Sequence, residues 1–320
     1  MNRIAALLVT LMFCAGIAAQ GYPSRPVTLV VPLAAGSTAD IVSRIVGAEL
    51  AKRLAQPVVV ENRPGAGGII ALQQVASAPP DGYTIALVTN GTLAINMGLY
   101  AKPGYDPVKD FTPITLVGEV SNIMVVHPNN PAKTVGDVIA RAKAKPGETT
   151  FSSGGNGTSH HLSGVLFAKM AGLDIVHVPY KGAPQGVFAV MANEVSMGFF
   201  NTPSVISQIR DGKLKALAVT SKTRIPLFPA LPTLDESGLK GYEVTAWFGF
   251  AGPRGLPAPI RDRLYNEIVS LMKDPAVRDQ LVNQGFQLLP QMAPIEFGDL
   301  IQSEVAKWVP IVKASGAKIE

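Results

Sequence analysis

One segment of the chain, residues 151–164, combines bare backbone with small polar side chains in the sequence FSSGGNGTSHHLSG. Its glycines permit a tight turn whose N–H groups converge on one point, and Thr158 or Ser159 is suited to cap the helix that the following apolar spacing predicts. Free amides in the first turn of a helix attract negative charge. The segment therefore predicts a binding site for a small anion such as a carboxylate.

A second segment, residues 32–40 (PLAAGSTAD), has the same construction. It follows a β-branched run and leads into a helix that we expect to begin near Thr38 or Ala39. In one such loop, glycine and serine are explained as well by helix capping as by anion binding. Two loops of this kind in one chain favour a single anion-binding site that both loops share. Two facing helix N-termini would hold a carboxylate without a cationic side chain, and each charge-assisted hydrogen bond contributes roughly 1.5–3 kcal/mol.

A third loop, residues 178–186 (VPYKGAPQG), places the hydroxyl of Tyr180 and the charge of Lys181 at the end of an expected strand. Tyr180 packed in the core with Lys181 in solvent is an equally good interpretation. Trp247 is either a wall of the site or a core aromatic near a hinge, and we favour the core.

Other chemistries have little support in the residues. His160 and His161 are adjacent, so on a helix they point about 100° apart and do not share a metal ion. His127 and His177 fall in expected strands without nearby ligand partners, and the glycines of residues 62–68 (NRPGAGG) lack the spacing of a dinucleotide site. No Gly-x-Ser-x-Gly turn presents a nucleophile. We therefore expect no metal, no cofactor and no catalysis.

The first twenty residues are typical of a secretory signal peptide. Arg3 precedes an apolar run over residues 4–19 that ends in small residues, so the mature chain is expected to begin close to Gln20 or Gly21. Cys14, the only cysteine, follows a phenylalanine where a lipoprotein signal requires a small residue, and is expected to be removed. These features predict an exported, periplasmic monomer without disulfides and without membrane insertion after cleavage.

The 320-residue chain has a formal net charge of +5. Its Lys and Arg residues are scattered, and no basic stripe is interleaved with aromatic side chains, so we expect no nucleic-acid partner. A mildly basic surface is compatible with an anionic solute.

Short β-branched runs alternate with amphipathic stretches, which indicates repeated β-α-β units and parallel sheets. Strands are expected at residues 27–31, 58–62, 84–88, 122–128, 174–180, 195–200, 214–221 and 242–253, and helices at 38–54, 68–76, 134–147, 159–171, 185–194, 257–272 and 295–313. The chain is expected to enter a second unit near Asn122 and to return near Tyr242. The predicted domains are a signal peptide over residues 1–20, one lobe over residues 21–122 and 243–320, and another over residues 123–242.

The mature chain resembles the periplasmic substrate-binding proteins of tripartite tricarboxylate transporters, the Bug family. The resemblance rests on motifs in family order and spacing: YPSRPVTLVVPLAAGSTADIVSR, VVVENRPGAGG, PPDGYTIAL, YDPVKDFTPI, FSSGGNGTSHHLSGVLF, VPYKGA and LPTLDESG. It implies an α/β, two-lobed periplasmic-binding-protein fold of type II, with two doubly wound sheets and a ligand cleft between them. It also implies a receptor that delivers a small organic carboxylate to membrane permease subunits.

By this resemblance the first two loops grip one carboxylate through backbone amides, hydroxyls and water. Asp40 occupies the acidic position at the start of the first helix, where it contacts a ligand amine or orients the loop. The full set of expected ligand-binding residues is Leu33, Ala35, Gly36, Ser37, Thr38, Asp40, Asn90, Ser153, Asn156, Gly157, Thr158, Ser159, His160, Tyr180, Lys181 and Asn201.

Two departures from the family pattern bear on specificity. Ser37 stands where a second glycine is common, and Leu93 replaces a histidine, which predicts a more apolar distal end of the pocket and an aromatic or longer-chain carboxylate rather than citrate. Two other functions stay open at this point. One is a ligand-sensing accessory of a membrane sensor kinase, and the other, less supported, is a periplasmic hydrolase.

Overall fold

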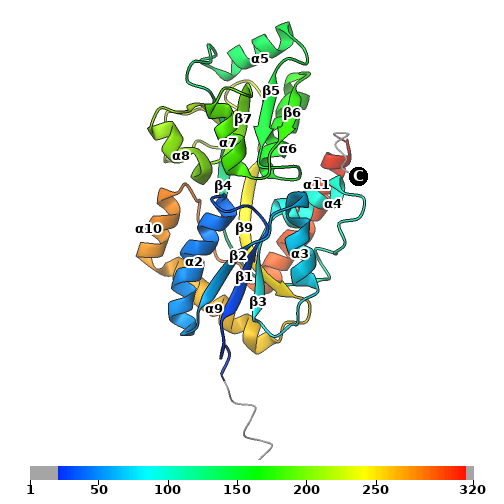
Figure 1. Ribbon diagram of the computed structural model, residues 1–320, viewed down its shortest axis with the longest axis vertical. Coiled ribbons are helices and arrows are strands. Elements are labelled where there is room, and N and C mark those ends of the chain that lie inside the picture. Colours follow the sequence, from blue (N-terminus) through cyan, green and yellow to red (C-terminus); the bar gives the residue numbers. More distant parts are fainter. Residues whose placement is uncertain (1–20, 315–320) are drawn as a thin grey trace, which may run out of the picture.

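The computed structural model describes residues 21–314, which form two lobes (Figure 1). The expected signal peptide lies outside the described residues. The strands form a sheet in the order β2-β1-β3-β9-β4-β7-β5-β6, and β8 also pairs with β4. This is the α/β architecture that the alternation of strands and helices predicted, with the two expected sheets joined through β4.

The first lobe begins with parallel strands. β1 (Val27–Val31) lies between β2 (Val58–Asn62) and β3 (Thr84–Thr89), and these strands are connected through α2 (Thr38–Leu54) and α3 (Ile69–Ala76), as predicted. The carboxyl ends of parallel strands meet at one edge of a sheet. The loops that follow the three strands therefore gather at the edge that faces the second lobe (Figure 1).

Two long antiparallel strands run between the lobes. β4 (Phe111–Val126) pairs with β9 (Thr245–Pro253) over its first part and with β7 (Met197–Asn201) and β8 (Lys215–Val219) over its last part. The sequence predicted a strand only from residue 122. The earlier part was missed because its ladder with β9 contains two register shifts, and such irregularities interrupt the two-residue alternation of side chains.

The second lobe repeats the parallel arrangement. β5 (Thr150–Ser153) pairs in parallel with β6 (Val176–Pro179) and with β7. Its helices are α5 (Val135–Ala144), α6 (Ser159–Ala171), α7 (Ala183–Met191) and α8 (Thr202–Arg210). The helix α8 was not predicted, because it follows β7 directly without a loop. The lobe boundaries given above remain a proposal, which the change of partners along β4 supports.

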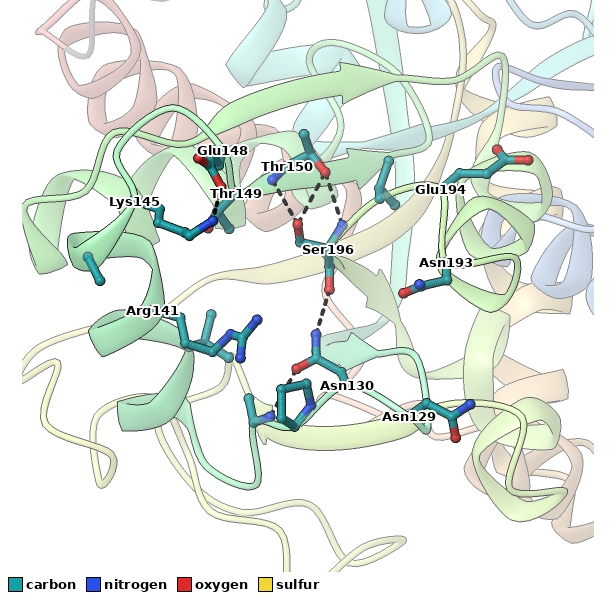
Figure 2. A pocket seen from close by; sticks show the side chains of 15 residues that line it. Asn129, Asn130, Arg141, Lys145, Glu148, Thr149, Thr150, Asn193, Glu194 and Ser196 are labelled. Carbon is teal, nitrogen blue, oxygen red and sulfur yellow. Dashed lines mark hydrogen bonds and ion pairs between the residues drawn. The ribbon is translucent and has the colours of Figure 1, made fainter.

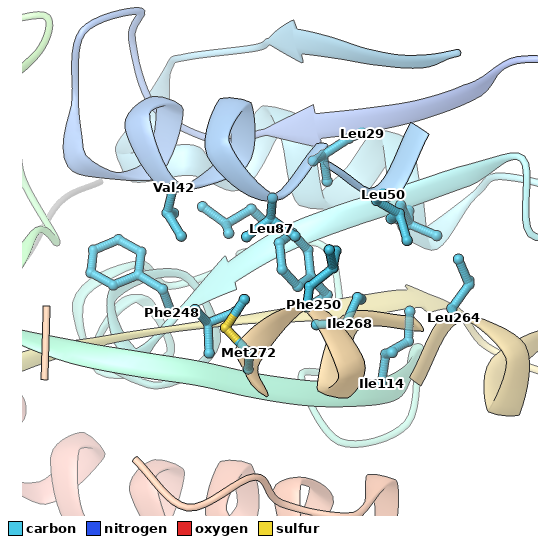
Figure 3. Close-up of a cluster of buried hydrophobic side chains, with 14 of the residues drawn as sticks. Leu29, Val42, Leu50, Leu87, Ile114, Phe248, Phe250, Leu264, Ile268 and Met272 are labelled. Atoms are coloured by element: carbon cyan, nitrogen blue, oxygen red, sulfur yellow. The ribbon is translucent and has the colours of Figure 1, made fainter. Parts of the chain in front are cut away.

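Helices cover both faces of the first lobe's sheet. Figure 3 shows α2 and α9 (Ala258–Lys273) enclosing Leu29, Leu87 and Phe250. Burial of each such side chain stabilises the fold by about 1.5–3 kcal/mol. The helix α10 (Pro275–Asn283), which also contributes to this cluster, was not predicted, because Asp274 both ends α9 and caps α10.

The opposite face is covered by α3 and α11 (Pro294–Ala314). Trp247 on β9 packs edge-on against Phe297 of α11, with ring centroids 5.6 Å apart, and its indole N–H donates to Glu304. The core position favoured for Trp247 is therefore confirmed. None of the described helices is both long enough and apolar enough to cross a membrane.

A small apolar cluster joins the two lobes beside this face. After β3 the chain forms a π-helix, η3 (Gly91–Ile95), and a short helix, α4 (Asn96–Leu99). Their apolar side chains pack with Trp308 of α11 and with Leu162 of α6, which belongs to the second lobe. The second lobe is thus anchored to the first through α6, the helix that follows the glycine-rich segment.

Candidate ligand-binding site

A cavity of about 420 Å³ lies between the lobes. Its walls come from the loops that follow β1, β2, β5 and β6, together with the end of β7. The lining residues are Leu33, Ala34, Ser37, Thr38, Pro64, Gly65, Ala66, Gly67, Gly68, Tyr100, Gly154, Gly155, Asn156, Thr158, His160, Pro179, Tyr180, Lys181, Gly182, Ala183 and Asn201. A much smaller cavity adjoins it through shared residues and reaches Asn90, Gly157 and Ser159.

Nine of the expected ligand-binding residues therefore line the main cavity: Leu33, Ser37, Thr38, Asn156, Thr158, His160, Tyr180, Lys181 and Asn201. Three others line the adjoining cavity, namely Asn90, Gly157 and Ser159. Ala35, Gly36, Asp40 and Ser153 line neither. Sequence reasoning missed residues 64–68, which were assigned to a helix start, and Tyr100, for which no local pattern gave a signal.

The lobes touch around this cavity. A Cβ added to Gly182 would lie 2.7 Å from the Cβ of Ala34, and one added to Gly67 would lie 2.7 Å from the carbonyl oxygen of Asn156. The hydroxyl oxygens of Thr38 and Ser204 are 3.2 Å apart across the lobes. Side chains larger than glycine would not fit at these contacts, so the two lobes are closed over the cavity.

Asp40 stabilises the loop that precedes α2, within residues 32–40, through hydrogen bonds. Ser37 caps α2 by accepting from the amide of Asp40, and Oδ2 of Asp40 accepts from the amide of Gly36 at 2.9 Å. Burial alone would raise the pKa of Asp40, but hydrogen bonds from Arg44 and Gly36 outweigh it and hold that pKa below its usual range. Of the two roles expected for Asp40, the structure supports orienting the loop. Because Asp40 accepts from the Gly36 amide, that amide is not a free donor, and a ligand contact of Gly36 stays a prediction.

The glycine-rich segment differs from the expected nest. The amides of Gly154 and Gly157 donate to Nδ1 of His160 and His161, at 3.2 and 3.4 Å, and the amide of Gly155 donates to Oγ of Ser153 at 3.1 Å. These three amides therefore do not converge on an anion. The loop ends at Thr158, whose hydroxyl caps α6 by accepting from the amide of His161.

The donors left over are in the first turns of the two helices. Within the described residues, no acceptor is found for the amides of Thr38 and Ala39 at the start of α2, or for those of Ser159 and His160 at the start of α6. Both helix starts border the main cavity, and the start of α6 also borders the adjoining one. Unsatisfied first-turn amides carry a partial positive charge, which suits a carboxylate.

Asn201, at the end of β7, is held by β4 and α6 beside the cavity. Its Nδ2 donates to Oδ1 of Asn122 on β4 and to Oγ of Ser159, while its Oδ1 lies 3.1 Å from Nε2 of His160. Asn122 in turn donates to Ser163 at 2.8 Å. The amide of Asn201 is thus fixed by protein partners.

The walls of the main cavity are nearly uncharged. Lys181 is the only cationic side chain among the lining residues, and it is exposed at the rim. Burial lowers the pKa of His160 to about 4, so that this imidazole is neutral at pH 7. Burial raises the pKa of Tyr100, so its phenol also stays neutral. Among the described residues, no group of three or more His, Cys, Asp or Glu side chains is arranged to hold a metal ion.

One pair resembles a catalytic dyad by distance alone. Oγ of Ser153 lies 2.7 Å from Nε2 of His177. The side chain of Ser153 is fully buried and lines neither cavity, so a substrate between the lobes does not reach it. This pair does not support the hydrolase alternative.

A larger cavity, about 840 Å³, lies away from the interlobe region at the end of the second lobe (Figure 2). It is a polar groove between α5 and the turn that precedes β7, and it carries charges of both signs. Its cations are Arg141 and Lys145, and Lys145 is paired with Glu148 at 2.8 Å. This mixed charge does not favour a small anion.

The interpretation of Leu93 is wrong. Its side chain is fully buried in the apolar cluster with Val88 and Trp247, and it lines neither interlobe cavity. The replacement of histidine by leucine at this position therefore changes the core and does not make the pocket more apolar.

Comparisons with known proteins agree with this geometry. Residues 42–317 match the model of the family described as tripartite tricarboxylate transporter family receptor. Protein BugT of Bordetella pertussis is 33% identical, covering 100% of this chain and 99% of BugT. The structure of R. palustris Rpa4515 with adipate has a TM-score of 0.90 at 34% identity, covering 93% of this chain and 100% of that one.

Two further solved structures are similar over nearly the same range. The periplasmic binding protein BugD has a TM-score of 0.88 at 35% identity, covering 93% of this chain and 100% of that one. MatC from Rhodopseudomonas palustris with bound malate has a TM-score of 0.86 at 33% identity, covering 91% and 100%. The family match extends over most of the chain, and the chain belongs to the TctC family of tripartite tricarboxylate transporter receptors.

Proposed function

We propose that this protein is a periplasmic receptor that binds a small organic carboxylate between its lobes and delivers it to the permease subunits of a tripartite tricarboxylate transporter. The observation that carries the proposal is the pair of capped helix starts, α2 and α6, which border the main cavity with unsatisfied amides. Such donors bind a carboxylate without a formal positive charge. Family membership supports the transporter partner.

The cavity also bears on the class of carboxylate. Its volume of about 420 Å³ is ample for a ligand of about six to eight carbon atoms, and its walls include Tyr100, Tyr180, two prolines and several glycines. Lys181 is the only cation available for a second negative group. A mono- or dicarboxylate with an apolar body fits these walls better than a tricarboxylate with three charges. The relatives whose structures contain adipate and malate support a dicarboxylate.

A thermal-shift screen of residues 21–320 tests the proposal. The protein is unfolded, dialysed and refolded to remove carried-over ligand, and then exposed to mono-, di- and tricarboxylates, aromatic acids and acidic amino acids. A ligand at one hundred times its Kd adds about 2.7 kcal/mol of stability, which is a rise in Tm of roughly 4 °C for a protein of about 300 residues. A rise confined to a few mono- or dicarboxylates is expected. No rise with any carboxylate would contradict the proposal.

A further inference from the structure

Three histidines surround the glycine-rich segment in the second lobe. His160 and His161 lie in the first turn of α6, and His177 lies on β6. The rings of His161 and His177 are stacked, with centroids 4.3 Å apart, and His177 also stacks on Phe151. We call His160, His161 and His177 the histidine brace.

The brace supplies acceptors to the loop that ends at α6. Nδ1 of His160 accepts from the amide of Gly154, and Nδ1 of His161 accepts from the amide of Gly157. His177 acts through Ser153, whose Oγ lies 2.7 Å from the imidazole and accepts from the amide of Gly155. The amides of Gly154, Gly155 and Gly157 are therefore tied, directly or through Ser153, to one of the three rings.

We propose that the histidine brace positions the glycine-rich segment for ligand binding, and that it does so only with His160 and His161 neutral and unprotonated at Nδ1. The brace holds the loop against the lobe, which leaves the first-turn amides of Ser159 and His160 open toward the cavity. The part of this inference that concerns ligand affinity rests on the proposed function. In this role His160 is a positioning residue, although it was expected to contact the ligand.

Hydrogen bonding favours one tautomer of His160. A neutral imidazole has one donor and one acceptor nitrogen. Nδ1 faces the amide of Gly154, whereas Nε2 faces both Oδ1 of Asn201 at 3.1 Å and the backbone amide of Asn201 at 3.3 Å. With the proton on Nε2, the ring accepts from Gly154 and donates to Oδ1 of Asn201, and loses only the longer contact from the Asn201 amide. With the proton on Nδ1, the ring would accept from the Asn201 amide but lose both other bonds, so the geometry favours Nδ1 as the acceptor. Both ring nitrogens are used within the protein. Protonation of Nδ1 would set two N–H groups against each other and release the loop.

The surroundings favour the neutral form. Burial lowers the pKa of His160 and of His161 to about 4, and burial together with the neighbouring His161 lowers that of His177 to about 3. The other titratable group in contact with this region of α6 is Tyr242, which donates to the carbonyl oxygen of Ser163 and stays neutral. The brace is thus a set of uncharged rings at the pH of most growth media.

The first test reads the tautomers directly. Long-range ¹H–¹⁵N spectra of the unliganded wild-type protein, with rings assigned from single variants, are recorded at pH 7.0 and 5.5. For His160 and His161 we expect a protonated Nε2 and an unprotonated Nδ1 at both pH values. A proton on Nδ1 of either ring at pH 7.0, or an imidazolium at pH 5.5, would overturn the proposal. This measurement does not require a ligand, so it is independent of the proposed function.

The second test uses matched variants. In His160→Asn and His161→Asn the side-chain oxygen can replace Nδ1 as acceptor, whereas His160→Leu and His161→Leu keep volume and remove the acceptor. Hydrogen exchange of the Gly154 and Gly157 amides should accelerate about tenfold or more in the leucine variants and stay near wild type in the asparagine variants. Affinity for adipate, used as the probe, should fall about fivefold to tenfold in His161→Leu and stay near wild type in His161→Asn, because His161 lines neither interlobe cavity.

Each outcome of the second test is decisive. Unchanged exchange in the leucine variants, or equal acceleration in the asparagine variants, would contradict the brace. If wild-type protein does not bind adipate or any other carboxylate while the exchange results hold, the brace stands as a loop-positioning device and the proposed function fails.

Discussion

At the scale of single residues, most of the polar groups near the cavity already have partners. Asp40 accepts from the Gly36 amide, the brace accepts from the glycine-rich segment, and Asn201 is held by Asn122. What remains for a ligand is a small set of helix-start amides on neutral walls, with Lys181 at the rim. If the amides bind one carboxylate of the ligand, only a few side chains remain to discriminate between ligands at the other end.

The contribution of Lys181 can be separated from that of the amides. Lys181→Gln should weaken the binding of dicarboxylates about threefold to tenfold, because an exposed charge contributes a modest, salt-screened attraction. Binding of the matching monocarboxylate should not change. Isothermal titration calorimetry at low and moderate salt measures both. Lys143→Gln, on the exposed face of α5, is the matched control and should leave both affinities at wild-type values. Equal losses for both ligand types would show that Lys181 does not meet a second carboxylate.

At the scale of elements, the sequence predicted what local patterns determine. The helices α2 and α6 begin where their caps predicted, at Thr38 and Ser159. The side-chain oxygens of Ser37 and Thr158 each accept a hydrogen bond from a backbone amide in the first turn of the helix. The first part of β4 was missed because its bulges break the alternation of side chains. The internal partners of the glycine amides were also missed. They depend on His160 and His161 folding back on the loop and on residues brought together only by tertiary packing, which no spacing reveals.

Gly182, at the start of α7, allows the lobes to close. Its backbone is extended, so alanine is tolerated locally, but the added Cβ would lie 2.7 Å from the Cβ of Ala34 in the other lobe. Gly182→Ala should therefore lower ligand affinity about tenfold or more by opposing closure, while the Tm of the unliganded protein stays unchanged. Gly136→Ala, where the nearest atom lies 3.6 Å away, is the control. Small-angle scattering with and without ligand would show whether compaction is lost. Wild-type affinity in Gly182→Ala would mean that binding does not require this contact.

At the scale of the whole molecule, the two lobes share one sheet through β4, and this strand and β9 are the long connections between them. Ligand binding by such a protein is a population shift toward the closed form, driven by contacts that only the closed form makes. The first-turn amides of α2 and α6 provide such contacts, since they belong to different lobes. The amides of α6 are in place only while the glycine-rich segment keeps its position, which links binding to the protonation state of the brace.

The same histidines make global stability depend on pH. Their pKa values are lowered from 6.5 to about 4, 4 and 3, so the folded state binds fewer protons than the unfolded state as the pH falls below about 6.5. The stability that they contribute is present above the unfolded pKa and is lost as the pH falls toward the folded values. Between pH 7.5 and 5.5 the loss is about 1.3 kcal/mol for each histidine, or about 4 kcal/mol for the three as an upper figure.

Urea unfolding at pH 7.5, 6.5 and 5.5 measures this loss. Glu119 acts in the opposite direction, because burial raises its pKa and its protonation favours the folded state, while the lowered pKa of Asp40 places its effect at more acidic pH. A net fall in the free energy of unfolding is therefore attributable to histidines only if it depends on them. The double variant His160→Asn/His161→Asn should lose about two thirds of the pH-dependent decrease, since two of the three rings are gone. A decrease of wild-type size in this variant would place the titrating groups elsewhere in the molecule.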